Sequence, residues 1–294
     1  MILVTGATGN VGSEAVRLLA DQRLPVRALV RDPARAPHGP VGIAVGDFDR
    51  PETLDAAMRD VDTVLLVSPA VPAQEIAVID SAVRAGVAHV VKVTSKASAD
   101  SPVDRRRGQA RIEAHLLGSG PAWTLLRSNA YMQNLLALAP MIRETGGFVM
   151  SAGDGQVGMI DARDVAAAAA AIVAAPAAHA GNTYWLTGPE LVTYADVAEE
   201  LTAEYRRISP GEHREAMIRA GVPEPVANSN AQAFGLIAEG DAAWLSPDVE
   251  SLTGRPPRTL RSFVAEHVAA FQTSSRTSPD SRAISSGQTG FENR

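Results

Sequence analysis

The chain has no cysteine among its 294 residues, which excludes disulfide bonds, thiolate zinc sites and a cysteine nucleophile. Lysine is nearly as scarce, because Lys92 and Lys96 are the only two and arginine supplies the other basic side chains. Long apolar runs are also missing: the longest, residues 165–178, is mostly alanine and too short to span a bilayer. Since the first residues already form an apolar strand, we expect no signal peptide, no membrane segment and a cytoplasmic location.

Several functional patterns are absent as well. The net charge is −6, so nothing in the composition favours a nucleic-acid partner. The six histidines are scattered without ligand spacing, and we expect no metal site. The sequence contains neither the Gly-x-Ser-x-Gly elbow of hydrolases nor the Gly-x-x-x-x-Gly-Lys loop of P-loop nucleoside triphosphatases. A small molecule is the expected partner, and the chain is expected to be a monomer or a weak homo-oligomer.

What the sequence does contain is a glycine-rich turn at its start. Residues 1–12 read Met-Ile-Leu-Val-Thr-Gly-Ala-Thr-Gly-Asn-Val-Gly, and residues 13–22 continue with apolar residues at helical spacing. A strand, a glycine turn and a helix are the context required of a dinucleotide-binding fingerprint. The first glycine allows the tight turn, the second a close approach to the pyrophosphate, and the third close packing of the helix. The predicted cofactor-binding residues in this turn are Gly6, Thr8, Gly9, Asn10, Val11 and Gly12.

The hydrophobic pattern predicts an α/β fold with a doubly wound parallel sheet of Rossmann type. Short apolar runs alternate with helical segments, as parallel sheets with crossover helices require. The six predicted strands cover residues 1–5, 26–30, 41–45, 62–67, 89–95 and 122–126.

The composition predicts three parts. Residues 1–180 form the dinucleotide-binding domain, which ends with a helix over 165–175 that Asp164 caps. Residues 181–271 form a smaller, mostly helical lobe with a strand at 182–186, a helix at 209–220 and a loop at 221–233. Residues 272–294 are rich in Ser, Thr, Arg and Gly and are predicted to be a disordered tail.

The ends of the second and third strands suggest which cofactor is bound. Arg31 follows the second strand, where a dinucleotide fold meets the adenosine ribose, and its planar fork suits a 2′-phosphate. Arg35 could assist, whereas the neighbouring Asp32 would suit the 2′-hydroxyl of NADH. We predict NADPH rather than NADH. Asp47 and Phe48 follow the third strand and are predicted to lie at the adenine edge.

Further motifs resemble a known family. These are the glycine turn, the Arg31 tip, Trp-Thr-Leu-Leu-Arg at 123–127, Asn-Ala-Tyr-Met-Gln-Asn at 129–134, Asp161 with Asp164-Val-Ala, and Leu-Thr-Gly-Pro at 186–189. Residues 1–271 resemble the NmrA-like atypical short-chain dehydrogenase/reductases, most of all the type-2 NADPH:quinone oxidoreductases and the triphenylmethane-dye reductases. The resemblance implies that Val67 and Ser68 flank the ribose. It also implies that residues 94–96, with Thr94, and residues 127–129, with Asn129, border the nicotinamide.

One part of the usual chemistry is missing. Ordinary short-chain dehydrogenases use a Tyr-x-x-x-Lys pair, whose lysine lowers the tyrosine pKa so that the tyrosine can protonate an alkoxide. Here Ala88 precedes Lys92 by four residues and Lys92 precedes Lys96, so the pair does not exist. Ser95, Lys96 and Tyr131 remain as candidate catalytic residues, and Gln133 and Asn134 could orient a carbonyl or cap a helix.

Three functions therefore stay open. The first is an NADPH-dependent reductase that passes hydride to a quinone or a related aromatic or conjugated ketone, since such an acceptor delocalises the charge that forms. The second is a ketoreductase of an aromatic polyketide antibiotic pathway. The third is a non-catalytic NADP(H) sensor that engages another protein.

Overall fold

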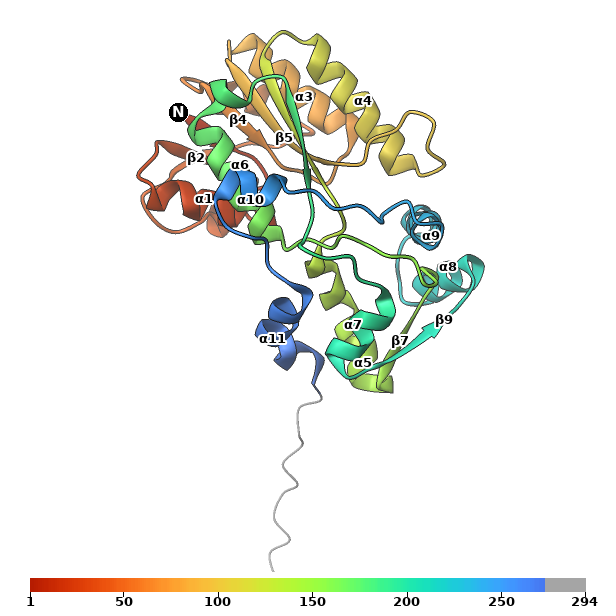
Figure 1. Ribbon diagram of the computed structural model, residues 1–294. Coiled ribbons are helices and arrows are strands. Elements are labelled where there is room, and N and C mark those ends of the chain that lie inside the picture. Colours follow the sequence, from red (N-terminus) through yellow and green to blue (C-terminus); the bar gives the residue numbers. More distant parts are fainter. Residues whose placement is uncertain (273–294) are drawn as a thin grey trace, which may run out of the picture.

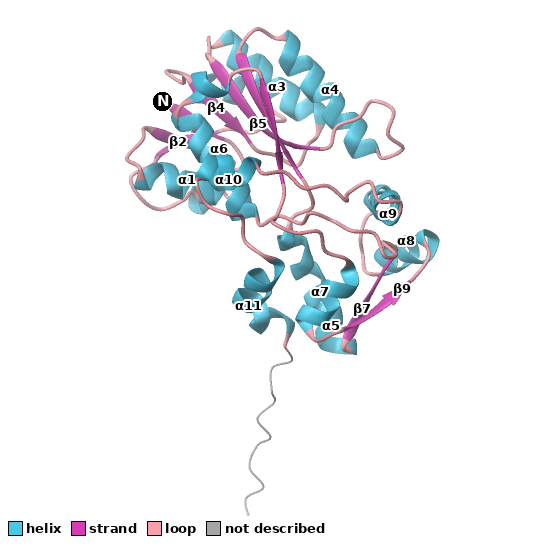
Figure 2. Ribbon diagram, viewed as in Figure 1, coloured by secondary structure: helices cyan, strands magenta, loops and turns pink. Residues whose placement is uncertain are grey.

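The computed structural model describes residues 1–272. The predicted disordered tail lies outside the described residues apart from Gln272. The described residues form two parts: a large parallel sheet with helices on both faces, and a smaller lobe below its edge (Figures 1 and 2).

The large sheet has seven parallel strands in the order β3-β2-β1-β4-β5-β6-β8. The order in which the chain adds strands reverses between β1 and β4, and this switch point is where doubly wound sheets bind their ligands. The prediction of a doubly wound parallel sheet is therefore confirmed. The strands are β1 Ile2–Val4, β2 Val26–Val30, β3 Gly42–Val45, β4 Thr63–Leu66, β5 His89–Ser95, β6 Ala122–Ser128 and β8 Asn182–Leu186.

Helices cover both faces of this sheet because each carries an apolar stripe. One face packs against α1 (Asn10–Asp21), α6 (Ala162–Ala174) and α10 (Asp248–Thr253). The other face packs against α2 (Pro51–Ala57), α3 (Pro72–Arg84) and α4 (Asp104–Gly118). Alanine fills much of α6, and these small side chains allow α1 and α6 to lie close together.

The smaller lobe has its own apolar core. It contains a two-stranded parallel sheet, β7 (Gly147–Met150) with β9 (Glu204–Arg207). Its helices are α5 (Ala139–Thr145), α7 (Tyr194–Leu201), α8 (Pro210–Arg219), α9 (Glu224–Ala238) and α11 (Leu260–Phe271), with a 3-10 helix at Met132–Leu138. Figure 2 shows this lobe beneath the carboxyl ends of the central strands.

The division between the two parts differs from the expected boundary at residue 180. Strand β8 was expected in the lobe, but it pairs with β6 as the outermost strand of the large sheet. Conversely, β7 lies before residue 180 and belongs to the lobe. The chain crosses between the two parts several times.

Three local predictions are wrong. Residues 221–233 were expected to be a loop, but α9 begins at Glu224 because Pro225 lies in its first turn, where proline is tolerated. The first turn of α1 begins at Asn10 rather than at residue 13. Asp161 rather than Asp164 caps α6, since its carboxylate accepts from the backbone N–H of Arg163.

Within residues 1–272, no helix combines the length and the apolar character that crossing a membrane requires. The same residues contain no cluster of three or more His, Asp or Glu side chains able to hold a metal ion.

Candidate functional site

Two of the three glycines in the opening turn are required by the packing of the protein itself. Gly6 has φ of +58°, and a Cβ there would lie 2.6 Å from the carbonyl oxygen of Val67 at the end of β4. A Cβ on Gly12 would collide with the carbonyl oxygen of Gly6. These residues hold the turn against the switch point between β1 and β4.

Gly9 is different, because the protein leaves room for a side chain there. Its φ is −94°, and a Cβ would come no nearer than 3.4 Å to the Gly6 carbonyl oxygen. Gly9 is exposed and begins α1 without a side-chain cap, so the first N–H groups of the helix face outward. A bare backbone at a helix N-terminus suits an anion that approaches closely. This cradle fits the pyrophosphate of a dinucleotide.

Arg31 stands at the carboxyl tip of β2 and is exposed. It forms no ion pair within the part of the chain that the structure describes, so its guanidinium is available to a ligand. Asp32 already has a structural task, because it accepts from the backbone N–H of Ala34 at 2.9 Å and caps a short 3-10 turn. The competing acid at this strand tip is therefore engaged locally.

The predicted adenine-edge residues lie just beyond β3. The Asp47 carboxylate accepts from the backbone N–H of Asp49 at 3.1 Å and stays half-buried. Phe48 packs partly against the core on the α2–α4 face. Both lie beside the β2 tip because β3 pairs with β2.

At the end of β4, Ser68 connects the site to a buried ion pair. Its hydroxyl donates to Glu75 at 2.6 Å, and Glu75 pairs with the ammonium of Lys92, which is fully buried in β5. Burial lowers the pKa of Lys92, and the Glu75 carboxylate opposes that effect. Lys92 is thus held beneath the sheet edge and fixes the position of the residues that end β4. The backbone N–H of Val67 beside it donates to the hydroxyl of Thr5 at 2.8 Å.

A second buried network joins β5 to β6. Thr94 donates to Glu113 of α4 at 3.0 Å, and Glu113 also pairs with Arg127 at 2.5 Å. The Arg127 guanidinium lies 5.1 Å from the ring centroid of Trp185 on β8. Thr94 and Arg127 lie at the rim of the site, which is formed by the carboxyl ends of the strands, and they shape it mainly through these internal contacts.

The next rim residue, Lys96, is tied to a segment far away in the sequence. Its ammonium lies 2.7 Å from Asp241, which also pairs with Arg106 at 2.5 Å. Burial alone would raise the pKa of Asp241, but hydrogen bonds from Arg106 and Lys96 outweigh it and keep the pKa below the ordinary value. Asn129 contacts the same segment, donating to the carbonyl oxygen of Ala242 at 3.0 Å. No sequence motif marks Asp241, so the sequence does not predict its contact with Lys96.

Of the other two catalytic candidates, Ser95 is half-buried at the end of β5. The Tyr131 hydroxyl lies 3.1 Å from Ser128, which donates to the Thr94 carbonyl oxygen. Burial raises the pKa of Tyr131. Both lysines have carboxylate partners, so neither is placed to acidify a tyrosine.

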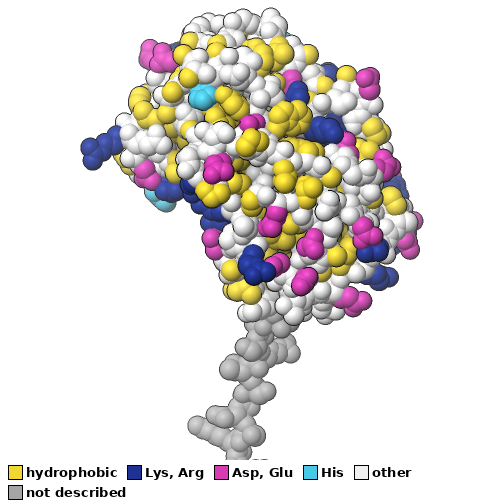
Figure 3. Space-filling model, viewed as in Figure 1, with side chains coloured by type: hydrophobic (Ala, Val, Ile, Leu, Met, Phe, Trp, Pro, Cys, Tyr) yellow, Lys and Arg dark blue, Asp and Glu magenta, His cyan; other side chains and the backbone are white. Residues whose placement is uncertain are grey.

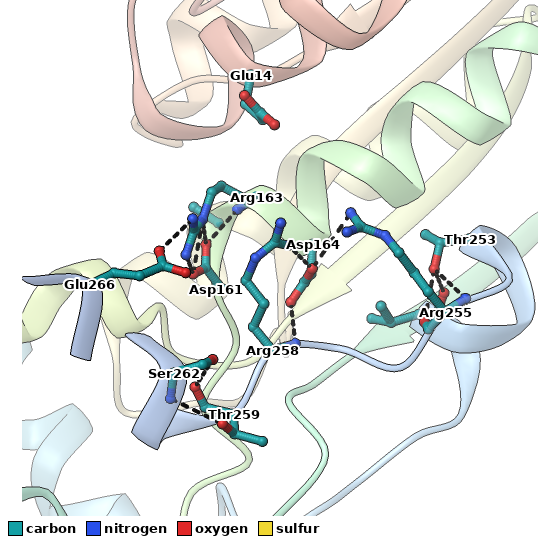
Figure 4. A network of polar contacts seen from close by, with 12 residues as sticks. Glu14, Asp161, Arg163, Asp164, Thr253, Arg255, Arg258, Thr259, Ser262 and Glu266 are labelled. Atoms are coloured by element: carbon teal, nitrogen blue, oxygen red, sulfur yellow. Dashed lines mark hydrogen bonds and ion pairs between the residues drawn. The ribbon is translucent and has the colours of Figure 1, made fainter. Parts of the chain in front are cut away.

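The remaining motif residues form a network at the start of α6 (Figure 4). Gln133 donates to Asp161 and accepts from the backbone N–H of Ala162, so it caps the helix and is not free to orient a carbonyl. Asp161 also binds Arg163, which reaches Glu266 of α11. Asp164 pairs with Arg258 in the connection before α11. The network fastens the lobe to the helix that packs beside the glycine turn. Asn134 is exposed.

On the face drawn in Figure 3, acidic and basic side chains are interspersed among apolar ones, with no extended region of one sign.

Comparison with known proteins shows which family and which enzymes this chain is similar to. A family model described as the NmrA-like family matches residues 1–250. The NAD(P)H azoreductase of Xenophilus azovorans is 41% identical over 284 residues, covering 92% of this chain and 99% of the relative. The Escherichia coli NADPH-dependent quinone oxidoreductase QOR2, complexed with NADPH, is 30% identical with a TM-score of 0.82, covering 90% of this chain and 99% of the other. The Citrobacter sp. triphenylmethane reductase, complexed with NADP(H), is 27% identical with a TM-score of 0.81 and the same coverage.

Proposed function

The chain belongs to the NmrA-like family, and from that premise we propose that it is an NADPH-dependent reductase that passes hydride to a quinone or a related conjugated acceptor. Relatives of this chain carry the names azoreductase, quinone oxidoreductase and triphenylmethane reductase, and all three names denote acceptors with delocalised electrons. NADPH would supply the hydride.

The cofactor part of the proposal rests on the cradle. Gly9 leaves its backbone bare where no protein atom needs the space, and the first turn of α1 offers N–H groups there. Arg31, exposed and without an ion pair among residues 1–272, would bind the 2′-phosphate. Asp47 and Phe48 would contact the adenine side, and Val67 and Ser68 the ribose. Thr94 and Asn129 would border the nicotinamide.

The choice of acceptor rests on one observation: within residues 1–272, no lysine or tyrosine candidate is well placed to give a proton to a substrate. Lys92 is fully buried against Glu75, Lys96 is bound to Asp241, and burial raises the pKa of Tyr131. An ordinary ketone needs a proton as its alkoxide forms. A quinone spreads the charge over its ring and can take its proton from water. The task of the protein is then to hold the acceptor against the cofactor and to keep solvent out.

The direct test is oxidation of NADPH followed at 340 nm with a panel of quinones, azo dyes, polycyclic aromatic ketones and unconjugated ketones. We expect turnover with quinones or azo compounds and little with unconjugated ketones. Binding of NADPH without oxidation by any acceptor would refute the reductase and would favour an NADP(H) sensor. Preference for the aromatic ketones would favour the ketoreductase of a polyketide pathway.

A further inference from the structure

The connection between α9 and α10 crosses the carboxyl ends of three strands. We call residues 241–246 of this connection the strap. Asp241 binds Lys96 after β5, the Ala242 carbonyl oxygen accepts from Asn129 after β6, and the Ser246 N–H donates to Thr187 after β8 at 3.2 Å. Figure 1 shows the connection running between the sheet and the lobe. The strap thus lies over the strand ends that face the reacting end of a cofactor bound at Gly6–Gly12.

Between its anchors the strap presents apolar side chains. Ala243 and Leu245 are exposed, Leu245 by 48%, and Trp244 is half-buried. The Trp244 ring meets Trp185 edge-to-face with 5.2 Å between the ring centroids. Since Arg127 lies over Trp185 in turn, the orientation of Trp244 is fixed by a stack of side chains that begins in the buried network of Glu113.

The backbone of the strap also has little freedom. The Gly158 N–H donates to the Ala242 carbonyl oxygen at 3.3 Å. A Cβ on Gly158 would collide with the Trp244 carbonyl oxygen and would come within 3.3 Å of Leu245. The ion pairs of Asp241 with Lys96 and Arg106 hold the other end. An aromatic surface held this firmly loses little conformational entropy when a flat molecule binds to it.

We propose that the strap is the wall of the acceptor site, that Trp244 stacks on a planar aromatic acceptor, and that Asp241 is the positioning residue that holds the wall in place. This inference rests on the proposed function. It specifies the substrate class further: acceptors with two or more fused planar rings bind better than single rings, because they cover more of the indole.

The test measures binding and turnover separately. Isothermal titration gives the dissociation constant of 1,4-naphthoquinone and of 1,4-benzoquinone for the NADP⁺-loaded protein, and initial rates with NADPH give KM and kcat. Trp244→Ala should weaken naphthoquinone binding by about tenfold and benzoquinone binding by much less. Trp244→Phe should restore most of the loss, and the affinity for NADP⁺ should stay unchanged. Trp123→Ala is the matched control, because Trp123 lies near the amino end of β6, at the opposite end of the strands from the strap.

Two further variants separate stacking from loss of structure. Gly158→Ala should displace the strap and raise KM for naphthoquinone while Trp244 is still present. Asp241→Asn should raise KM more than it lowers kcat, and the KM of the wild type should rise with salt as the ion pairs are screened. Thermal unfolding identifies any variant that is not folded.

The outcomes are distinct. If Trp244→Ala binds naphthoquinone as tightly as the wild type, the strap is not the acceptor wall, whether or not the enzyme turns over. If the wild type binds naphthoquinone through Trp244 but never oxidises NADPH, the proposed reductase fails and the wall remains.

Discussion

At the scale of single residues, the scarcity of lysine has a structural counterpart. Both lysines are used in ion pairs, Lys92 with Glu75 inside the sheet and Lys96 with Asp241 at its rim. Lys92 is fully buried and Lys96 is held by Asp241, so neither ammonium is free to reach a substrate. We therefore expect the chemistry of the site to depend on other groups.

The role of Arg31 can be tested by reversing its charge. We expect Arg31→Asp to weaken NADPH binding by about 10- to 100-fold, because a charge-assisted contact to a phosphate is lost and a repulsion is added. Binding of NADH, which has no 2′-phosphate, should change little. Dissociation constants from NAD(P)H fluorescence decide the matter, with Arg111→Asp on the exposed face of α4 as control. An equal effect on both cofactors would contradict the assignment.

Tyr131 gives a prediction about pH. Because burial raises its pKa above the ordinary value of about 10, the phenol stays protonated throughout the neutral range. We expect kcat/KM for a quinone to show no ionisation step between about pH 6 and 9. Tyr131→Phe should retain that flat profile and most of the rate. A basic limb that disappears in Tyr131→Phe would show instead that the tyrosine is the acid.

At the scale of elements, helices are fixed to the sheet by buried charge as well as by apolar contact. Glu75 of α3 meets Lys92 of β5, and Glu113 of α4 meets Arg127 of β6. Both pairs lie beneath the strand ends that carry Ser68 and Thr94. Buried pairs of this kind set position more than they add stability, because desolvation offsets much of the attraction.

The pair between α3 and β5 can be tested by a double-mutant cycle. Lys92→Met alone should destabilise the protein by about 3–5 kcal/mol, because Glu75 is left buried without its partner. Adding Glu75→Leu should recover most of that loss, since no buried charge then remains. Urea unfolding of the two single variants and the double variant measures the coupling. Additive losses would mean that the two side chains do not act as a pair.

Asp161, which caps α6, should make the free energy of unfolding depend on pH in the acid range. Burial alone would raise the pKa of Asp161, but hydrogen bonds from Arg163 and Gln133 outweigh it and lower the pKa. The stabilisation is then present above the ordinary carboxyl pKa of about 4 and is lost as the pH falls through the depressed value. Asp161→Ala should cost about 0.5–2 kcal/mol of unfolding free energy at pH 7 and should flatten the acid slope. Denaturant unfolding at pH 7 and below pH 4 tests both statements.

At the scale of the whole molecule, the site is assembled from both parts of the chain. The glycine turn and Arg31 come from the large sheet, whereas the strap leaves the lobe after α9 and returns to the sheet at α10. The ion pairs of Arg163 with Glu266 and of Asp164 with Arg258 join the same two parts near α1. Cofactor binding should therefore stabilise the molecule as a unit.

NADPH at 100 times its dissociation constant should stabilise the native state by about 2.7 kcal/mol, because only the folded protein binds it. That corresponds to a rise in Tm of about 4–5 °C for a chain of this size. Calorimetry should show one transition that moves as a whole, and NADH at the same concentration should move it less. A transition that splits, with only one part shifted, would show that the lobe unfolds independently of the cofactor-binding sheet.

The sequence by itself determined the local features. The strand, glycine turn and helix around Gly6–Gly12 follow from the short-range pattern and from backbone stereochemistry. The alternation of strands and helices follows from the hydrophobic pattern, and the absence of a Tyr-x-x-x-Lys pair is read directly from the residues. The family resemblance drawn from these motifs is confirmed by the family model. The assignments of Arg31, Asn129 and Tyr131 stay predictions, although each lies at a strand end near the site.

Only the tertiary structure decided which distant residues meet. Asp241 lies 145 residues from Lys96, and neither carries a motif that points to the other. The same holds for Trp244 on Trp185, for Asp164 on Arg258, and for β8, which the composition assigned to the wrong part. The physical reason is that pairing across long loops depends on how the whole chain packs, and charge and apolar character at one position do not encode their partner.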